Sequence, residues 1–159
     1  MTTSRMTLSA LNSTPPASNP AQVESVNDRV VLSFLDTVDQ TAYWTFQAPF
    51  GLTAPLTLVI NYFAAVASGT IAFKASLEAV TPTDPLALDV ATSFDTANSS
   101  SADTVPATAG YLATMSITLT NNDSIAAGDT VRLSILRDTV TDSAAGKVYL
   151  YTADLRDAA

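Results

Sequence analysis

The chain of 159 residues contains no histidine and no cysteine. Without histidine it has no imidazole to act as a general base near neutral pH, and it lacks the commonest metal ligand in proteins. Without cysteine it can form no disulfide, no thiolate nucleophile and no zinc cluster. These two absences exclude a Ser-His-Asp triad, a Cys-His pair and the usual structural zinc sites.

Charged residues are also few, at 14% of the chain, and one sign dominates them. Fifteen acidic side chains stand against 7 basic ones, which gives a net charge of -8. The basic residues are scattered along the sequence at Arg5, Arg29, Lys74, Arg132, Arg137, Lys147 and Arg156. An acidic chain without a basic cluster is not expected to bind nucleic acid, whereas its charge favours solubility and attraction to a basic surface.

Long hydrophobic runs are missing as well. A membrane helix needs about 20 consecutive apolar residues, and the most apolar run, at 56–66, is interrupted by Thr57 and Asn61. The first 20 residues contain one arginine and no continuous apolar region, so they do not resemble a secretory signal. We therefore expect no membrane partner, and synthesis in the cytoplasm.

What the sequence does contain is alternation of apolar and polar residues. In 70–79, Ile71, Phe73 and Ala75 fall on one side of an extended chain and Lys74 and Ser76 on the other. A helix would scatter these two sets around its circumference, so the pattern predicts a β-strand. Similar patterns predict strands at 29–35, 41–48, 55–65, 70–79, 111–120, 130–137 and 147–154. The segment 82–106 is expected to be a long surface excursion, and counting a short strand at about 87–94 within it gives eight strands.

Eight antiparallel strands without a helix predict an all-β fold, a single antiparallel β-sandwich. The eight-stranded jelly roll is the expected topology, and an immunoglobulin-like sandwich is the alternative. Hydrophobic residues make up 47% of the chain, which is typical of a folded domain rather than a disordered one. We expect an extended N-terminal arm over 1–26 and the sandwich domain over 27–159.

The predicted arm combines prolines with isolated apolar residues. Three prolines lie within 15–20, and proline favours an extended backbone at its own position and the one before it. One interpretation is a disordered tail without a role. The other is an arm that becomes ordered on a partner, because its apolar residues offer anchors. The candidate contacts in the arm are Arg5, Met6, Leu8 and Leu11.

The aromatic residues divide into a core candidate and a surface candidate. Trp44 shares a strand face with Ala42 and Phe46, so we expect it in the core. Tyr149 and Tyr151 share one face of the last strand, opposite Val148 and Leu150. Because both faces of that strand are apolar, the two tyrosines are candidate partner contacts, covered by another chain or by the arm.

The residues present offer little catalytic chemistry. A paired-carboxylate glycosidase is the one remaining hydrolase design, and it needs two carboxyl groups about 5 to 9 Å apart across a cleft. Glu78 falls on the outward face of its strand, where we expect a solvated charge. Asp138 and Asp142 are expected in a hydrogen-bonded turn, since the spacing lacks the glycine and terminal glutamate of a calcium loop. We expect no enzyme, no cofactor and no metal.

Four segments carry a resemblance to a known group of proteins: 43–49, 56–62, 69–75 and 127–138. In these segments, in their order and in the polar arm before them, the chain resembles small jelly-roll capsid decoration (cement) proteins of tailed bacteriophages and related head-fibre domains. The resemblance implies a virion protein, made in the host cytoplasm and placed on the outer capsid surface. Its implied partners are the major capsid protein, whose neighbouring subunits it bridges, and its own copies in a homotrimer. It implies no catalytic residues.

A second hypothesis is a receptor- or glycan-binding domain of a phage head fibre or tail protein. It predicts a solvent-exposed aromatic cluster and saturable sugar binding. A structural subunit of the tail or baseplate is a third.

Overall fold

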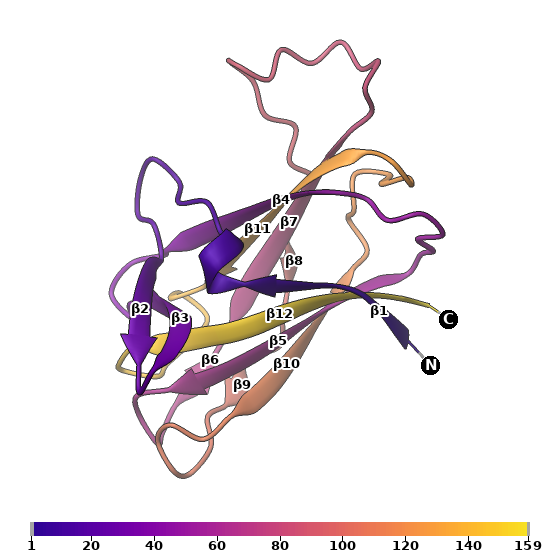
Figure 1. The fold of residues 1–159 in the computed structure, drawn as a ribbon. Coiled ribbons are helices and arrows are strands. Elements are labelled where there is room, and N and C mark those ends of the chain that lie inside the picture. Colours follow the sequence, from indigo (N-terminus) through magenta and orange to yellow (C-terminus); the bar gives the residue numbers. More distant parts are fainter. Residues whose placement is uncertain (1, 159) are drawn as a thin grey trace.

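The computed structural model describes residues 2–158, which fold into two antiparallel sheets packed face to face (Figure 1). The first sheet contains, in spatial order, β10 (Ala113–Leu119), β5 (Leu56–Ala64), β12 (Val148–Ala158), β3 (Arg29–Phe34) and β2 (Gln22–Val26), with β1 (Thr2–Ser9) paired to the second half of β12. The second contains β4 (Thr41–Gln47), β11 (Thr130–Arg137), β7 (Phe73–Val80) and β8 (Asn98–Ser99). A short pair, β6 (Thr70–Ile71) and β9 (Asp103–Thr104), and the 3-10 turn η1 (Ala10–Asn12) complete the elements.

The order in which the strands pair decides the topology. Counted from β3, the eight main strands pair first with last, second with seventh, third with sixth and fourth with fifth: β3 with β12, β4 with β11, β5 with β10, and β7 with β8. This nested pairing is that of an eight-stranded jelly roll. The predicted all-β jelly roll is confirmed, and the immunoglobulin-like alternative is not.

The alternation of residue types explains the core between the sheets. Along β11, Val131, Leu133 and Ile135 are fully buried, while the residues between them are partly exposed. Trp44 is 1% exposed, and its ring nitrogen donates a hydrogen bond to the carbonyl of Ser9 at 2.9 Å. The prediction that Trp44 belongs to the core is confirmed, and its polar atom is satisfied by the N-terminal segment.

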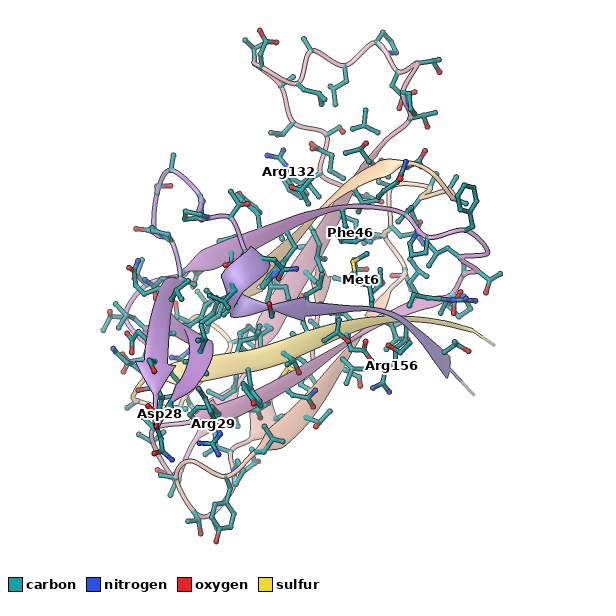
Figure 2. The ribbon with its side chains drawn as sticks, in the orientation of Figure 1. Met6, Asp28, Arg29, Phe46, Arg132 and Arg156 are labelled. Carbon is teal, nitrogen blue, oxygen red and sulfur yellow. The ribbon has the colours of Figure 1, made fainter. Side chains whose placement is uncertain are left out.

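The N-terminal segment lies along its own sandwich. In Figure 1, β1 runs beside β12, so the two ends of the chain are neighbours. Leu8 is buried in the core and Met6 packs against it, on the side where Phe46 also lies (Figure 2). After η1, Thr14 exchanges two backbone hydrogen bonds with Tyr43, at 2.7 and 3.0 Å. The segment is therefore extended and tied to both sheets.

The strand predicted at about 87–94 is wrong. This region is part of a long loop between β7 and β8 that projects beyond the sandwich (Figure 1), with Ala87 to Val90 closing a turn. The fifth main strand is the shorter β8, fixed by Asn98, whose amide donates to Ala75 and Asn121 carbonyls and accepts from Thr120 and the Asn121 amide. The four hydrogen bonds of this buried side chain thus fix β8, whereas the apolar alternation at 87–94 finds no neighbouring strand.

A tight hairpin between β2 and β3 positions the site described below. Its two turn residues, Asn27 and Asp28, both have positive φ angles, of 48° and 61°. Asparagine and aspartate tolerate this backbone better than other non-glycine residues, and two such residues make the hairpin turn that matches the strand twist. Arg29 begins β3 directly after the turn, at the end of the sheet (Figure 2).

Candidate functional site

A cleft of about 430 Å³ lies between the β2–β3 hairpin and the loop that precedes β10. We call it the aromatic cleft; the residues that line it are Val26, Asn27, Arg29, Phe63, Gly110, Leu112 and Tyr151. Its volume falls in the range of about 300–1,000 Å³ that is typical of small-molecule sites. Four segments that are far apart in sequence meet there.

Aromatic rings line the aromatic cleft. Phe63 and Tyr149 are cross-strand neighbours on β5 and β12, with ring centroids 5.0 Å apart and planes tilted by 34°. Tyr151 sits where the pairing of β12 with β5 shifts register between Leu150 and Thr152, and such a bulge re-aims the side chain. Tyr151 is 38% exposed. An aromatic surface is therefore presented to solvent.

The loop before β10 supplies the opposite wall. Gly110 has a φ angle of 81° and donates its amide to the carbonyl of Ala64 at 2.8 Å, which ties the loop to the end of β5. Tyr111 and Leu112 follow and are both more than 60% exposed. An exposed apolar surface beside exposed rings is typical of a ligand or protein contact site.

Arg29 stands out among the basic residues. Each of the other six forms an ion pair with a carboxylate: Arg5–Asp157, Lys74–Asp138, Arg132–Glu78, Arg137–Asp142, Lys147–Glu24 and Arg156–Asp154. Within residues 2–158, Arg29 has no such partner, and its guanidinium donates one hydrogen bond, to the carbonyl of Asn27 at 3.0 Å. A guanidinium carries five donor hydrogens, so most of those of Arg29 remain available at the aromatic cleft.

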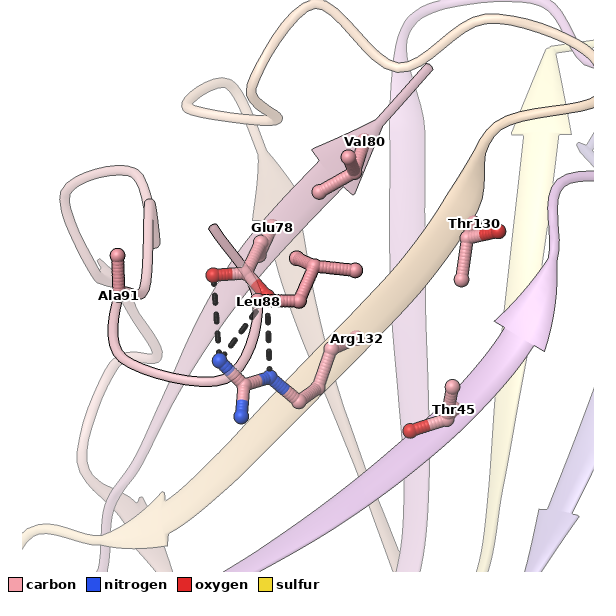
Figure 3. Close-up of a pocket in the computed structure, with 7 residues that line it drawn as sticks. All are labelled: Thr45, Glu78, Val80, Leu88, Ala91, Thr130 and Arg132. Carbon is pink, nitrogen blue, oxygen red and sulfur yellow. Dashed lines mark hydrogen bonds and ion pairs between the residues drawn. The ribbon is translucent and has the colours of Figure 1, made fainter. Parts of the chain in front are cut away.

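A second, smaller pocket of about 190 Å³ lies on the other sheet (Figure 3). Here Arg132 on β11 reaches Glu78 on β7, with a closest approach of 2.9 Å. The Arg132 guanidinium also lies 4.6 Å from the Phe94 ring centroid and 5.5 Å from that of Tyr43. We call this group the Arg132 clamp; the loop residues Leu88 and Ala91 line the same pocket (Figure 3).

The Arg132 clamp corrects the expectation for Glu78. Glu78 is 4% exposed rather than solvated, and it accepts the amide of Ser93 at 2.5 Å as well as the Arg132 pair. The outward face of β7 is covered at this point by the β7–β8 loop, which the strand pattern does not reveal. The clamp holds that loop against the sheet.

The predicted contact residues separate into two places. Tyr149 and Tyr151 lie at or beside the aromatic cleft; the N-terminal segment does not cover them, because β1 runs along 152–158 instead. In that segment Leu8 is buried in the core of the same chain, whereas Leu11 is 75% exposed. That the predicted residues of both places contact a partner stays a prediction.

Arg5 is engaged within the chain. Its guanidinium donates to Asp157 at 2.8 Å and to the carbonyl of Gly51 at 3.1 Å. The hydrogen bond from Arg5 is the main reason that the pKa of Asp157 is lowered, and the backbone amide of Thr53 adds to it. Asp157 in turn raises the pKa of Arg5. The pair fastens β1 to β12.

Asp138 and Asp142 form the predicted turn. The amides of Thr141 and Asp142 both donate to the Asp138 carbonyl, at 3.1 and 3.0 Å. Burial raises the pKa of Asp138, but hydrogen bonds from Thr141 and Lys74 outweigh it and leave this pKa below its ordinary value. Among residues 2–158, no three carboxylates are arranged to hold a metal ion. No helix in the same range is long and apolar enough to cross a membrane.

Sequence reasoning missed the residues that complete the aromatic cleft, among them Asn27, Arg29, Phe63 and Leu112. One signal was present: the doubly apolar last strand pointed to Tyr149 and Tyr151. Nothing in the sequence indicates that the hairpin after Val26 and the loop around Gly110 meet beside them.

No family model matches the chain, and no curated protein matches it. A solved structure of a carbohydrate-binding module, studied for its specific recognition of mannan, is similar to it over 100% of this chain and 99% of that one, with 9% identity and a TM-score of 0.48. The resemblance to capsid decoration proteins finds no support among these matches and stays a prediction.

Proposed function

We propose that the chain is a binding domain that takes a sugar in the aromatic cleft. The observation that carries this proposal is the exposed ring of Tyr151 beside the Phe63–Tyr149 pair, flanked by the polar groups of Asn27 and Arg29. A pyranose ring has a face of C–H groups that packs on an aromatic ring, and hydroxyl groups around its rim that form hydrogen bonds. The aromatic cleft offers both kinds of partner.

The rigidity of the surroundings supports the same proposal. Phe63 and Tyr149 project from paired strands, and the hairpin at Asn27 and the loop at Gly110 are both fixed by backbone hydrogen bonds. A site held by such elements loses little entropy on binding. The polar side chains that line the cleft, Asn27 and Arg29, can bind hydroxyl or anionic groups, which fits ligand binding better than bond cleavage.

The test is a glycan array followed by calorimetry on the best ligand. Tyr151→Ala should weaken binding about tenfold or more, because it removes the exposed ring. Phe50→Ala is the matched control, since Phe50 is an exposed aromatic residue at 88% that does not line the aromatic cleft; it should leave affinity unchanged. Absence of any saturable sugar binding, or equal binding by the Tyr151 variant, would contradict the proposal. The proposal would also be contradicted if Tyr151→Ala changed the oligomeric state of the chain and left its sugar affinity unchanged.

Capsid decoration is the second candidate, and the edge of β1 favours it. Among the described strands β1 pairs with β12 alone, so its other edge is open to a strand from a major capsid subunit or from another copy in a trimer. Exposed Leu11 follows this edge. Deleting residues 1–20 would also remove Leu8 from the core, so Leu11→Ala is the cleaner test. Images of phage particles should show dense symmetrical copies of this chain on the head, and fewer copies when the particles carry Leu11→Ala. An unchanged number of copies would show that Leu11 does not contribute to capsid binding.

A further inference from the structure

Within residues 2–158 Arg29 has no carboxylate partner, and this indicates which sugars the aromatic cleft takes. The chain has 15 acidic side chains and a net charge of -8, so carboxylates outnumber basic groups about two to one. Six of the seven basic residues find a carboxylate within 4 Å, and Arg29 is the exception within residues 2–158. The exception lies at the aromatic cleft rather than on a featureless surface.

Nearby carboxylates do not satisfy Arg29. Asp28 precedes it in the turn but makes no ion pair with it, and Glu24 on the neighbouring strand is held by Lys147 at 2.6 Å. The Arg29 guanidinium donates one hydrogen bond to the carbonyl of Asn27, and this contact restricts its position. Arg29 therefore lines the aromatic cleft with most of its donors free.

A guanidinium is planar and presents paired N–H groups that match a carboxylate or a sulfate in a two-point contact. Beside a stacking surface, such a group recognises a sugar ring that carries an anionic substituent. We propose that the aromatic cleft selects acidic sugars, whose carboxylate or sulfate pairs with Arg29 while the ring packs on the aromatic side chains. This inference rests on the proposed function.

Because the chain is acidic overall, Arg29 attracts an anionic group only at short range. A net charge of -8 repels polyanions at long range, but exposed charges more than about 10 Å apart are largely screened at 0.1 M salt. Arg29 therefore acts on an anionic group that is already in the aromatic cleft. The result is a preference among sugars and not a general affinity for polyanions such as nucleic acid.

The experiment compares neutral and acidic sugars that share a core. The probes are lactose with 3′-sialyllactose and 3′-sulfolactose, and tetragalactose with tetragalacturonate, each measured by calorimetry with the full chain. At least one acidic probe should bind about tenfold or more tightly than its neutral counterpart, and Arg29→Gln should bring this ratio close to one. Arg29→Lys, which keeps the charge and loses the planar fork, should retain part of the preference.

Arg156→Gln is the matched control, because it removes one positive charge from the same sheet near its other end (Figure 2). It should leave the preference intact. If sugars bind and Tyr151→Ala abolishes binding, yet the acidic and neutral probes bind equally, the acidic preference is overturned and the proposed function stands. If none of the probes and no glycan on the array binds, both fail. A preference for sialylated over sulfated lactose assigns the anion as a carboxylate, and the reverse assigns it as a sulfate; either supports the proposal.

Discussion

Arg132 and Arg29 lie near aromatic residues on different sheets of the jelly roll, and they differ in their carboxylate partners. Arg132 is paired and partly covered: Glu78 forms an ion pair with it, and the ring centroids of Phe94 and Tyr43 lie 4.6 and 5.5 Å from its guanidinium. Arg29 lies beside Phe63 and Tyr151 with no carboxylate partner within the described residues. The same residue types build a closed contact at one place and an open one at the other.

The two arginines differ in whether the chain itself supplies a carboxylate partner. At the Arg132 clamp, the carboxylate that satisfies the guanidinium also accepts the amide of Ser93, so the group holds the β7–β8 loop. At the aromatic cleft, no part of the described chain supplies that carboxylate. A ligand can supply it there, whereas at the clamp a ligand would first have to displace Glu78.

The largest expected effect concerns Arg137, which is the fully enclosed extreme of the comparison. It is 0% exposed, pairs with Asp142 at 2.6 Å and donates to the carbonyls of Phe34, Ala144 and Gly146. Arg137→Met should lower the free energy of unfolding by about 3–5 kcal/mol, because it leaves a buried carboxylate without a counter-charge. Chemical denaturation measures this, and a loss below about 1 kcal/mol would show that the enclosed pair is dispensable.

Glu78→Gln should have the next largest effect. It keeps the shape of the side chain and removes its charge, so Arg132 loses its ion pair; we expect a loss of about 1–2 kcal/mol. Limited proteolysis should then cut more rapidly within 81–97, since the loop is less firmly held. Sugar affinity at the aromatic cleft should not change, and a change there would break the separation between the two sites.

Acid sensitivity should come from the pair of Arg5 with Asp157, in which the carboxylate is buried and the guanidinium is partly exposed. Arg5 keeps the pKa of Asp157 lowered in the folded chain, so the pair stabilises the fold above the unfolded pKa of about 3.9, and this stability is lost as the pH falls through the folded value. Because the chain has no histidine, unfolding free energy should be nearly constant from about pH 5 to pH 7.

Thermal denaturation at a series of pH values tests this expectation. Asp157→Asn should lower stability at pH 7 and reduce the further loss at about pH 3. A steep change between pH 5 and pH 7, or an unaltered acid response in the variant, would contradict the assignment.

The smallest effect is expected from Arg29→Gln. With no ion pair to lose within the described chain, it should alter the free energy of unfolding by no more than about 0.5 kcal/mol. Chemical denaturation beside Glu78→Gln gives the direct contrast. A loss as large as that of the Glu78 variant would mean that Arg29 is a structural residue.

The alternation of apolar and polar residues predicted those features that depend on neighbouring residues in the sequence. Alternation placed the long strands and put Trp44 in the core, because a half-buried sheet imposes a period of two. The same reasoning failed at 87–94, where Leu88 and Val90 alternate but are exposed, since a strand also needs a partner. It expected a solvated Glu78, because the loop that covers this residue is set by tertiary packing.

The aromatic cleft was predictable in part. Tyr149 and Tyr151 were singled out because both faces of the last strand are apolar. Arg29 was indistinguishable from the other six basic residues in sequence, because its lack of a partner depends on where each carboxylate ends up after folding. The grouping of Met6 and Leu8 with the contact residues likewise could not reveal that β1 docks on its own sheet.

A titration followed by nuclear magnetic resonance tests whether acidic sugars bind in the aromatic cleft. ¹⁵N-labelled chain is titrated with the acidic sugar that binds best in calorimetry, and the amide shifts are mapped. Saturable shifts should gather at 26–29, 62–64, 109–112 and 149–152 and leave the Arg132 clamp unmoved. Shifts centred on the clamp or on β1, or no saturable shifts at all, would contradict the account.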